Sequence, residues 1–264
     1  MYCLHFGKEG AHPVVILPGL SIGYVTPAAR QIKKSYKILA ENYEIFLFDR
    51  RAGDLPASYS VQAMADDTAL VMEHMGIGSA GLFGVSQGGM MAQELVIRHP
   101  QLVDALILGS TSCRTEITED SSVTQWKNLA KAALRAPEEE FPDRVTELFD
   151  AFARAVYTPG FYDMVKRVLP VSAAGVSRHD LERFIILSDG MIGFDTRAHL
   201  NEITCPVLAI SAGKDRVFPE GASQELADLL GCPSYVYEDY GHAVYDEAPD
   251  YAGRLREFFD SVYA

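Results

Sequence analysis

The chain alternates short apolar runs with longer segments of helical periodicity, and this alternation limits the possible folds most strongly. The apolar runs lie at 13–17, 44–49, 80–85, 102–111, 205–213 and 233–239. Between them, segments such as 26–43, 60–77 and 86–99 repeat apolar residues at helical spacing. Strands that alternate with helices are typical of a parallel sheet covered by helices. The sequence therefore predicts an α/β fold, a mostly parallel sheet with helices on both faces.

One long segment interrupts this alternation. Between the fourth and fifth apolar runs, 123–134 and 143–157 each have a helical apolar stripe, and no strand alternates with them. We therefore expect 112–195 to form a mostly helical cap inserted over the carboxyl edge of the sheet. The core would then consist of 1–111 and 196–264.

Composition excludes several classes of partner. The 264 residues carry a net charge of −13, whereas nucleic acids and anionic membranes require basic surfaces. No apolar stretch approaches the roughly 20 residues of a membrane span, and the opening MYCLHFGKEGAHP lacks the pattern of a secretory signal. We expect a cytoplasmic protein with a small-molecule substrate, no nucleic acid partner and no membrane partner. The sequence does not determine its oligomeric state.

Four cysteines are scattered along the chain, at Cys3, Cys113, Cys205 and Cys232. They show no metal-ligand spacing, and reduced thiols are the ordinary state in the cytoplasm. No motif implies a metal or an organic cofactor, so we expect neither.

Ser86 stands between an apolar run and a helical segment, in the sequence Gly84-Val85-Ser86-Gln87-Gly88. A serine here is either a helix N-cap or a nucleophile, and the strand–turn–helix context favours the nucleophile. Glycines on both sides suit a strained turn at which larger side chains would collide. The helix that follows offers free N–H groups and a positive dipole end to a developing oxyanion.

A serine nucleophile needs a general base, and that base needs an acid to orient it. Asp215 follows the apolar run 205–213, and His242 follows the run 233–239. Because the carboxyl ends of parallel strands share one edge of a sheet, we expect both side chains to meet Ser86. The N–H groups of Leu20, in the loop after the first run, and of Gln87 are the candidate oxyanion donors.

The segments GVSQGG (84–89), GKDRVFP (213–219) and GHAVYDEAPDY (241–251) together resemble the α/β-hydrolase superfamily, in its single-domain form with an inserted cap. The resemblance runs from about residue 12 to the end. It implies a Ser86–His242–Asp215 triad and hydrolysis through an acyl-enzyme. It also argues against the haloalkane dehalogenases and epoxide hydrolases, which use an aspartate nucleophile.

Three features depart from the family pattern. The first loop begins Pro18-Gly19 where His-Gly is usual, which removes a side chain that often orders this loop. The usual Asp-x-Arg-Gly-x-Gly-x-Ser is reduced to the sequence DRRAG at 49–53. The segment before residue 13 is also too short for the full opening hairpin, so we expect one or two edge strands to be absent.

Several other residues are candidates for roles at or near the site. Glu116 is the alternative to Asp215 as the triad acid, because some members of this fold take the acid from the preceding strand. We interpret Asp49 as a residue that tethers a loop, and Cys113 as a buried thiol near the pocket. Four aromatic residues of the cap are candidates for the pocket wall: Trp126, Phe152, Phe161 and Tyr162.

The predicted function is hydrolysis of a small carboxylic ester by Ser86. A C–C bond hydrolase, an amidase or a thioesterase with the same triad remains open, because the sequence does not report the leaving group. A ligand-binding or signalling protein on a hydrolase scaffold is the alternative from a different class. The acyl chain length is also undetermined, since cap loops vary freely without changing the triad.

Overall fold

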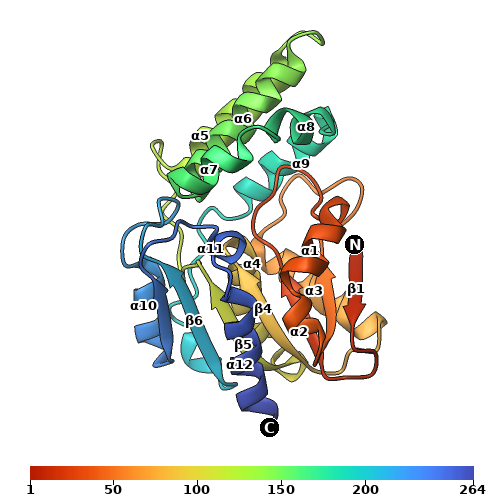
Figure 1. Cartoon of the computed structure of the whole chain (residues 1–264), viewed down its shortest axis with the longest axis vertical. Helices are drawn as coiled ribbons and strands as arrows, with labels where there is room; N and C mark the ends of the chain where they lie inside the picture. Colours follow the sequence, from red (N-terminus) through yellow and green to blue (C-terminus); the bar gives the residue numbers. More distant parts are fainter.

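A seven-stranded sheet forms the centre of the protein in the computed structural model, which describes residues 1–264 (Figure 1). The strands are β1 (Cys3–Gly7), β2 (Pro13–Leu17), β3 (Glu44–Phe48), β4 (Ala80–Val85), β5 (Val103–Gly109), β6 (Val207–Ala212) and β7 (Ser234–Tyr237). Their order across the sheet is β1-β3-β2-β4-β5-β6-β7, and only β1 runs antiparallel to its neighbour. The predicted α/β class is confirmed.

The centre of the sheet contains the point at which the chain reverses its direction of winding. From β2 the chain first adds β3 on one side and then β4 on the other, so β2 pairs in parallel with both. Ligands of open α/β sheets bind outside the carboxyl ends of the strands at such a point. The loops that leave β2 and β4 therefore border the expected site.

Helices cover both faces of the sheet, as the alternation predicts (Figure 1). On one face α3 (Val61–His74), α4 (Gln87–Arg98) and α10 (Ala222–Leu230) share an apolar core with the strands. On the other face α1 (Ala29–Ser35), α2 (Lys37–Ala40) and α12 (Tyr251–Tyr263) form a second core. The short helices η1 (Thr26–Ala28), η2 (Pro100–Leu102), η3 (Leu200–Glu202) and α11 (Val244–Glu247) lie in the connections. No helix combines the length and apolarity needed to cross a bilayer.

Five consecutive α-helices follow β5, before η3 and β6, and lie above the sheet in Figure 1. They are α5 (Ser122–Arg135), α6 (Phe141–Val156), α7 (Pro159–Val165), α8 (Leu169–Ala174) and α9 (Arg178–Asp189). The chain enters and leaves this insertion side by side, because the N–H of Thr115 donates to Phe194 (3.0 Å) and the N–H of Thr196 donates to Cys113 (2.8 Å). We call this helical insertion the cap below.

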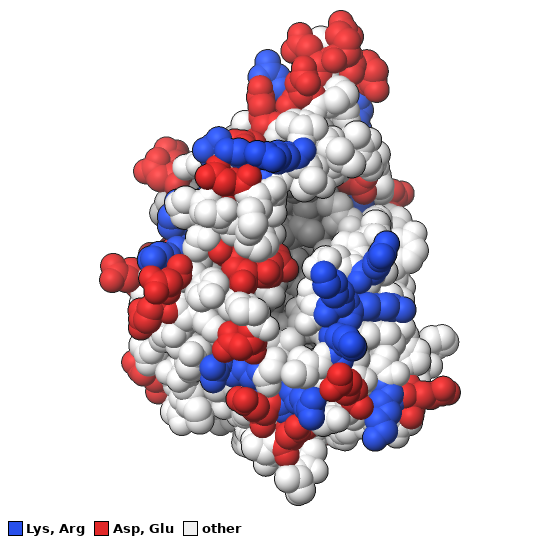
Figure 2. Space-filling view, viewed as in Figure 1, with Lys and Arg blue, Asp and Glu red and all other residues white.

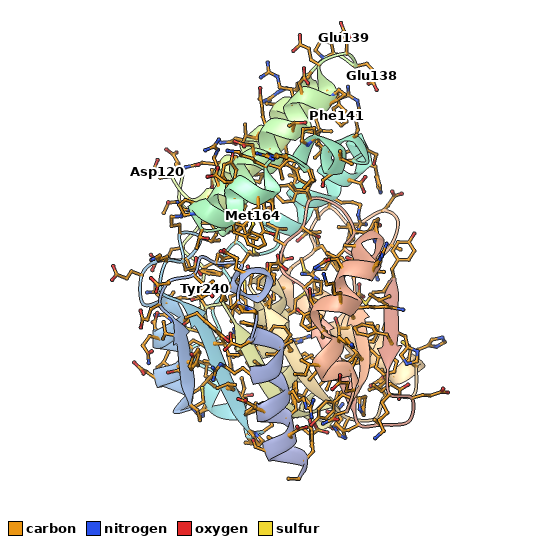
Figure 3. The ribbon with its side chains drawn as sticks, in the orientation of Figure 1. Asp120, Glu138, Glu139, Phe141, Met164 and Tyr240 are labelled. Atoms are coloured by element: carbon orange, nitrogen blue, oxygen red, sulfur yellow. The ribbon has the colours of Figure 1, made fainter.

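The cap has an apolar interior of its own. Val145 and Leu148 of α6 are fully buried, and Phe141 lies under the guanidinium of Arg178, 4.5 Å from its ring centroid. Glu138 and Glu139 lie at the free end of the cap, far from the sheet (Figure 3). The apolar stripes of the sequence therefore pack within the cap and against the core.

Near the amino terminus the structure differs from the sequence prediction in two places. The segment 26–43 is divided into η1, α1 and α2, because Tyr36 leaves helical geometry (φ −100°, ψ 18°) and its ring packs on Phe83 in the core. The opening residues form β1, which pairs with β3 in register Cys3↔Phe48. The sheet therefore has an antiparallel edge strand that the apolar runs did not indicate.

Candidate active site

Ser86 occupies a strained turn between β4 and α4. Its φ of 52° and ψ of −121° are rare for a residue with a side chain. The backbone is fixed on both sides of this turn, since the Ser86 N–H donates to Gly109 (2.9 Å) and the Thr111 hydroxyl donates to the Ser86 carbonyl (2.8 Å). Strain that persists under such support is typical of a functional residue.

The flanking glycines are explained by close backbone contacts. A Cβ on Gly84 would lie 2.8 Å from Cβ of Ala92, and a Cβ on Gly88 would lie 2.5 Å from the carbonyl oxygen of Pro18. Real Cβ atoms do not approach other heavy atoms this closely. Only glycine lets α4 pack directly against the loop that follows β2.

Asp215 and His242 meet in the loops after β6 and β7. Oδ2 of Asp215 lies 2.8 Å from Nδ1 of His242, and Oδ1 accepts from the N–H groups of Val217 (2.8 Å) and Phe218 (3.2 Å). Burial alone would raise the pKa of the Asp215 carboxyl, but the charge of His242 and these hydrogen bonds outweigh it and lower the pKa. The carboxylate is therefore ionised at neutral pH.

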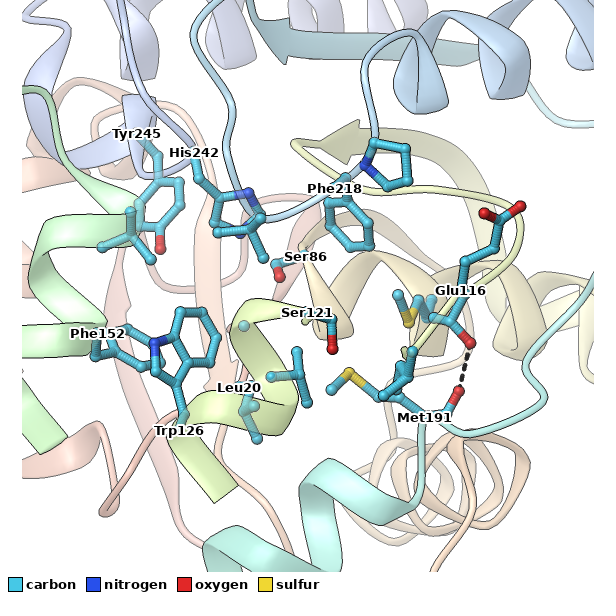
Figure 4. A pocket seen from close by; sticks show the side chains of 18 residues that line it. Leu20, Ser86, Glu116, Ser121, Trp126, Phe152, Met191, Phe218, His242 and Tyr245 are labelled. Carbon is cyan, nitrogen blue, oxygen red and sulfur yellow. Dashed lines mark hydrogen bonds between the residues drawn. The ribbon is translucent and has the colours of Figure 1, made fainter. Parts of the chain in front are cut away.

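The imidazole of His242 is buried, and it lies beside Ser86 in the same pocket (Figure 4). Its ring centroid lies 5.6 Å from that of Phe218. Because Nδ1 faces Asp215, Nε2 is the nitrogen left to exchange a proton with Ser86. The structure thus brings together the three residues that the sequence proposed as a triad.

The two candidate oxyanion donors are also beside Ser86. Leu20 lines the pocket, and a Cβ on the preceding Gly19 would lie 3.2 Å from Cβ of Ser86. Gln87 is the first residue of α4, so its N–H belongs to the free end of the helix. Neither N–H has a hydrogen-bond acceptor within the protein. Both remain available to a negatively charged oxygen.

An apolar pocket of about 650 Å³, its open mouth included, surrounds Ser86. Eleven of its 18 lining residues are hydrophobic: Leu20, Met90, Ile117, Val123, Trp126, Phe152, Val156, Met191, Val217, Phe218 and Tyr245. Trp126 and Phe152 form one wall in Figure 4, and Glu116 and Met191 lie on the opposite side. Figure 2 shows a hollow between the cap and the core in which the visible atoms are uncharged.

Two of the four aromatic candidates line the pocket. Trp126 and Phe152 pack on each other there, with ring centroids 4.3 Å apart. The prediction is wrong for Phe161 and Tyr162, which do not reach the pocket wall. The ring of Phe161 packs on Tyr157, and that of Tyr162 is buried within the cap beside Leu169, because α7 turns these residues toward other helices.

The remaining candidates take other positions. Glu116 lines the pocket but forms its ion pair with Arg114, so Asp215 is the acid that contacts His242. Asp49 accepts from the N–H groups of Val25 (2.7 Å) and Thr26 (3.3 Å), which tethers the loop after β2 as expected. Cys113 is fully buried outside the pocket wall. No three His, Cys, Asp or Glu side chains are grouped as a metal site.

Two buried residues support the site without having been singled out from the sequence. The hydroxyl of Thr111 holds the carbonyl of Ser86, and the guanidinium of Arg50 donates to Pro18 (2.7 Å) and to the side chain of Gln87 (3.0 Å). Arg50 is 3% exposed. An arginine two residues after a buried strand is the sequence signal that could have indicated it, because charged residues are rarely buried without a role.

Comparison with known proteins agrees with this geometry. The model of the alpha/beta hydrolase fold family matches residues 13–249. A protein of Mycobacterium tuberculosis named "Putative non-heme bromoperoxidase BpoC" is 29% identical over 252 residues, covering 86% of each chain. A pimeloyl-[acyl-carrier protein] methyl ester esterase of Neisseria meningitidis is 28% identical over 216 residues, covering 80% of each.

Solved structures share the architecture. A thermophilic esterase from Thermogutta terrifontis superposes with a TM-score of 0.80 at 20% sequence identity, over 100% of this chain and 94% of the other. At this identity the likeness concerns the fold alone. The family match, which extends over most of the sequence, is the stronger finding. The chain belongs to the alpha/beta hydrolase fold family.

Proposed function

We propose that this protein is a serine esterase that hydrolyses small, neutral, apolar carboxylic esters through an acyl-enzyme on Ser86. The observation that carries the proposal is the Asp215–His242 hydrogen bond of 2.8 Å beside a strained Ser86, in one apolar pocket. A nucleophile, a base and an orienting acid are the groups that acyl transfer needs.

In the first half of the reaction, Oγ of Ser86 attacks the ester carbonyl carbon while Nε2 of His242 takes the hydroxyl proton. The tetrahedral intermediate then breaks its carbon–oxygen bond to the alcohol, and His242 returns the proton to the leaving oxygen. In the second half, water attacks the acyl-enzyme and gives its proton to His242. The carboxylic acid departs as the proton returns to Ser86.

Two backbone groups stabilise the negative oxygen of both intermediates. The N–H groups of Leu20 and Gln87 are free of partners within the protein. Gln87 adds the positive end of the α4 dipole. Loss of one such donor in other enzymes costs roughly 10²–10³ in rate.

The polarity of the pocket supports neutral esters over anionic ones. No lysine or arginine lines it, and Glu116 is the single acidic residue in its wall. The Thr115 hydroxyl donates to Met191 (2.6 Å), and the Ser121 hydroxyl donates to Thr118 (2.9 Å), so neither is free to pair with a second polar group of a substrate. A substrate carboxylate would be desolvated there without a cation.

Ester chemistry is supported by relatives named as esterases or lactonases. The lining itself does not separate an ester from the diketones cleaved by C–C bond hydrolases. The hydroxyls of Thr115 and Ser121 are engaged, but the Tyr245 phenol lines the pocket without a partner in the protein and can bond a second carbonyl.

The proposal is tested with p-nitrophenyl esters of graded acyl length and with one matched pair of substrates. The pair consists of the dimethyl ester and the monomethyl ester of the same dicarboxylic acid, which differ mainly in one negative charge. We expect turnover of the p-nitrophenyl esters. We also expect kcat/KM to be at least about tenfold higher for the diester, equivalent to ~1.4 kcal/mol.

The Ser86→Ala variant is the control for both substrate sets. It should fold normally and lose turnover of every ester. Turnover that survives in this variant would overturn the proposed nucleophile, and preference for the monoester would overturn the proposed substrate class.

A further inference from the structure

Arg50 is a buried cation whose partners are neutral oxygens. Arg50 is 3% exposed, it forms no ion pair with a carboxylate, and its Nη1 has no hydrogen-bond partner. Burial lowers the pKa of Arg50 to about 10, so the group remains charged at neutral pH. A buried charge without an ion-pair partner is costly for stability. Its position therefore requires a reason other than stabilising the fold.

The partners of Arg50 are the two segments that carry the oxyanion donors. Nη2 donates to the carbonyl of Pro18 (2.7 Å), two residues before Leu20. Nε (3.3 Å) and Nη2 (3.0 Å) both donate to Oε1 of Gln87, the residue that supplies the second N–H. One rigid, planar group thus fixes the loop after β2 and the start of α4 relative to each other.

Asp49, which precedes Arg50 in the sequence, fixes the other end of the loop after β2. Asp49 accepts from the N–H groups of Val25 and Thr26, at 2.7 and 3.3 Å. The segment 18–26 is therefore held at both ends by consecutive residues at the end of β3. Leu20 lies between these two anchors.

The cap reaches the same network through α9. Nε2 of Gln87 donates to the carbonyl of Leu187 (2.7 Å). Arg183, on the same helix, donates to the carbonyls of Arg51 (2.7 Å) and Gly53, and its guanidinium lies 4.5 Å from the ring centroid of Tyr24. One cap helix therefore contacts the loop that carries Leu20, the loop after β3 and the side chain of Gln87.

We propose that Arg50 is a positioning residue that fixes the separation of the two oxyanion donors, and that α9 couples this separation to the seating of the cap. When α9 is seated, Gln87 is held between Arg50 and Leu187, and both N–H groups point at one oxygen. When α9 is displaced, Gln87 loses one of its two anchors and the oxyanion hole loosens. This inference rests on the proposed esterase function.

The test compares Arg50→Lys and Arg183→Met with the wild type. Lysine keeps the positive charge but cannot bond both acceptors in fork geometry. For Arg50→Lys we expect kcat to fall by about 10- to 100-fold, less than the roughly 10²–10³ for a lost oxyanion donor because both donors remain but are less well positioned, and KM to change by less than about threefold. Arg183→Met should also lower kcat, although the Arg183 side chain does not line the pocket.

Arg178→Met is the matched control. Arg178 lies on the same helix and also packs on an aromatic ring, but its carbonyl partners, Leu134 and Ala136, are inside the cap. We expect kcat and KM of Arg178→Met to equal those of the wild type. A loss of kcat in this control equal to that of Arg183→Met would overturn the coupling.

Hydrogen–deuterium exchange gives a readout that does not need activity. Exchange in 18–26 and 86–91 should quicken in Arg50→Lys and Arg183→Met, and stay unchanged in Arg178→Met. Unchanged exchange in Arg50→Lys, or a rise in KM with constant kcat, would overturn the inference. A folded wild type that a fluorophosphonate does not label would instead overturn the proposed function, while the exchange data would still report on the network.

Discussion

Oδ2 of Asp215 lies 2.8 Å from Nδ1 of His242, and the second oxygen of the same carboxylate accepts two backbone N–H groups of its own loop. The loop thus fixes the carboxylate, and the carboxylate fixes the imidazole. With the proton on Nδ1, Nε2 carries the lone pair that takes the Ser86 proton in the proposed mechanism. The strand ends of β6 and β7 set this geometry, because each residue follows its strand by only a few positions.

Asp215→Asn should leave the fold intact and impair catalysis. The asparagine amide can donate to Nδ1, which places the proton on Nε2 and removes the base, so kcat should fall by roughly 10³–10⁴. Because the pKa of Asp215 is lowered, its carboxylate is ionised in an assay near pH 7, where wild type and variant are compared. A folded variant that keeps more than about a tenth of the wild-type kcat would contradict the role of Asp215 as the orienting acid.

The same carboxylate should contribute to stability with a defined pH dependence. A lowered folded-state pKa stabilises the native state above the unfolded pKa of about 3.9, and this contribution is lost as pH falls through the folded pKa. Thermal unfolding of Asp215→Asn should therefore show a lower Tm than the wild type at neutral pH. The difference should shrink below about pH 4. A constant difference in Tm would contradict this linkage.

Gly88→Ala should destabilise the protein and reduce labelling of Ser86. Its Cβ would meet the carbonyls of Leu17 and Pro18, which are backbone atoms of a buried strand end, so we expect a loss above about 3 kcal/mol in the free energy of unfolding. Gly253→Ala is the control, because a Cβ there meets nothing within 4 Å in α12. The Gly253→Ala substitution should raise the free energy of unfolding by about 0.5–1 kcal/mol. Equal effects of the two substitutions would contradict the close-packed turn.

Trp126→Ala should move the chain-length preference toward longer acyl groups. The indole is 3% exposed and forms a wall of the pocket with Phe152. Space for two further methylenes is worth about 1.6 kcal/mol, or roughly tenfold in relative kcat/KM. Phe161→Ala, outside the pocket wall, should leave the profile unchanged. If both variants shift the profile equally, the assignment of the wall is wrong.

Glu116→Gln should relax the discrimination against anionic esters. The substitution removes the acidic group of the pocket wall, while its ion-pair partner Arg114 keeps its second carboxylate partner, Glu225 (3.3 Å). We expect kcat/KM for the monomethyl ester to rise by about three- to tenfold relative to the dimethyl ester, as for a charge effect of about 1 kcal/mol near a surface. An unchanged ratio would show that Glu116 does not determine this preference.

The sequence predicted six of the seven strands and the meeting of Ser86, Asp215 and His242, because both depend on local patterns. Ser86, Asp215 and His242 each lie within three residues of the end of an apolar run, and the carboxyl edge of a parallel sheet brings such positions together. The fates of Phe161 and Tyr162 could not be predicted in this way. An apolar stripe shows that a helix is buried on one side, but it does not show whether that side faces the pocket or another cap helix.

Arg50 illustrates a second limit. Its partners are the carbonyl of Pro18 and the amide of Gln87, which are distant in the sequence, and no local pattern encodes a backbone acceptor. The interruption of the predicted helix at Tyr36 also comes from a long-range contact. Packing of the Tyr36 ring on Phe83 overrides helix propensity. Long-range contacts therefore determine the support of the site, whereas local patterns determine its chemistry.

The most direct test is covalent labelling with a fluorophosphonate, followed by mass spectrometry of the intact protein and of its peptides. We predict one equivalent of label on Ser86 in the wild type and none in a folded Ser86→Ala variant. A folded wild type that takes no label, or takes it at another residue, would contradict a Ser86 nucleophile activated by His242 and Asp215.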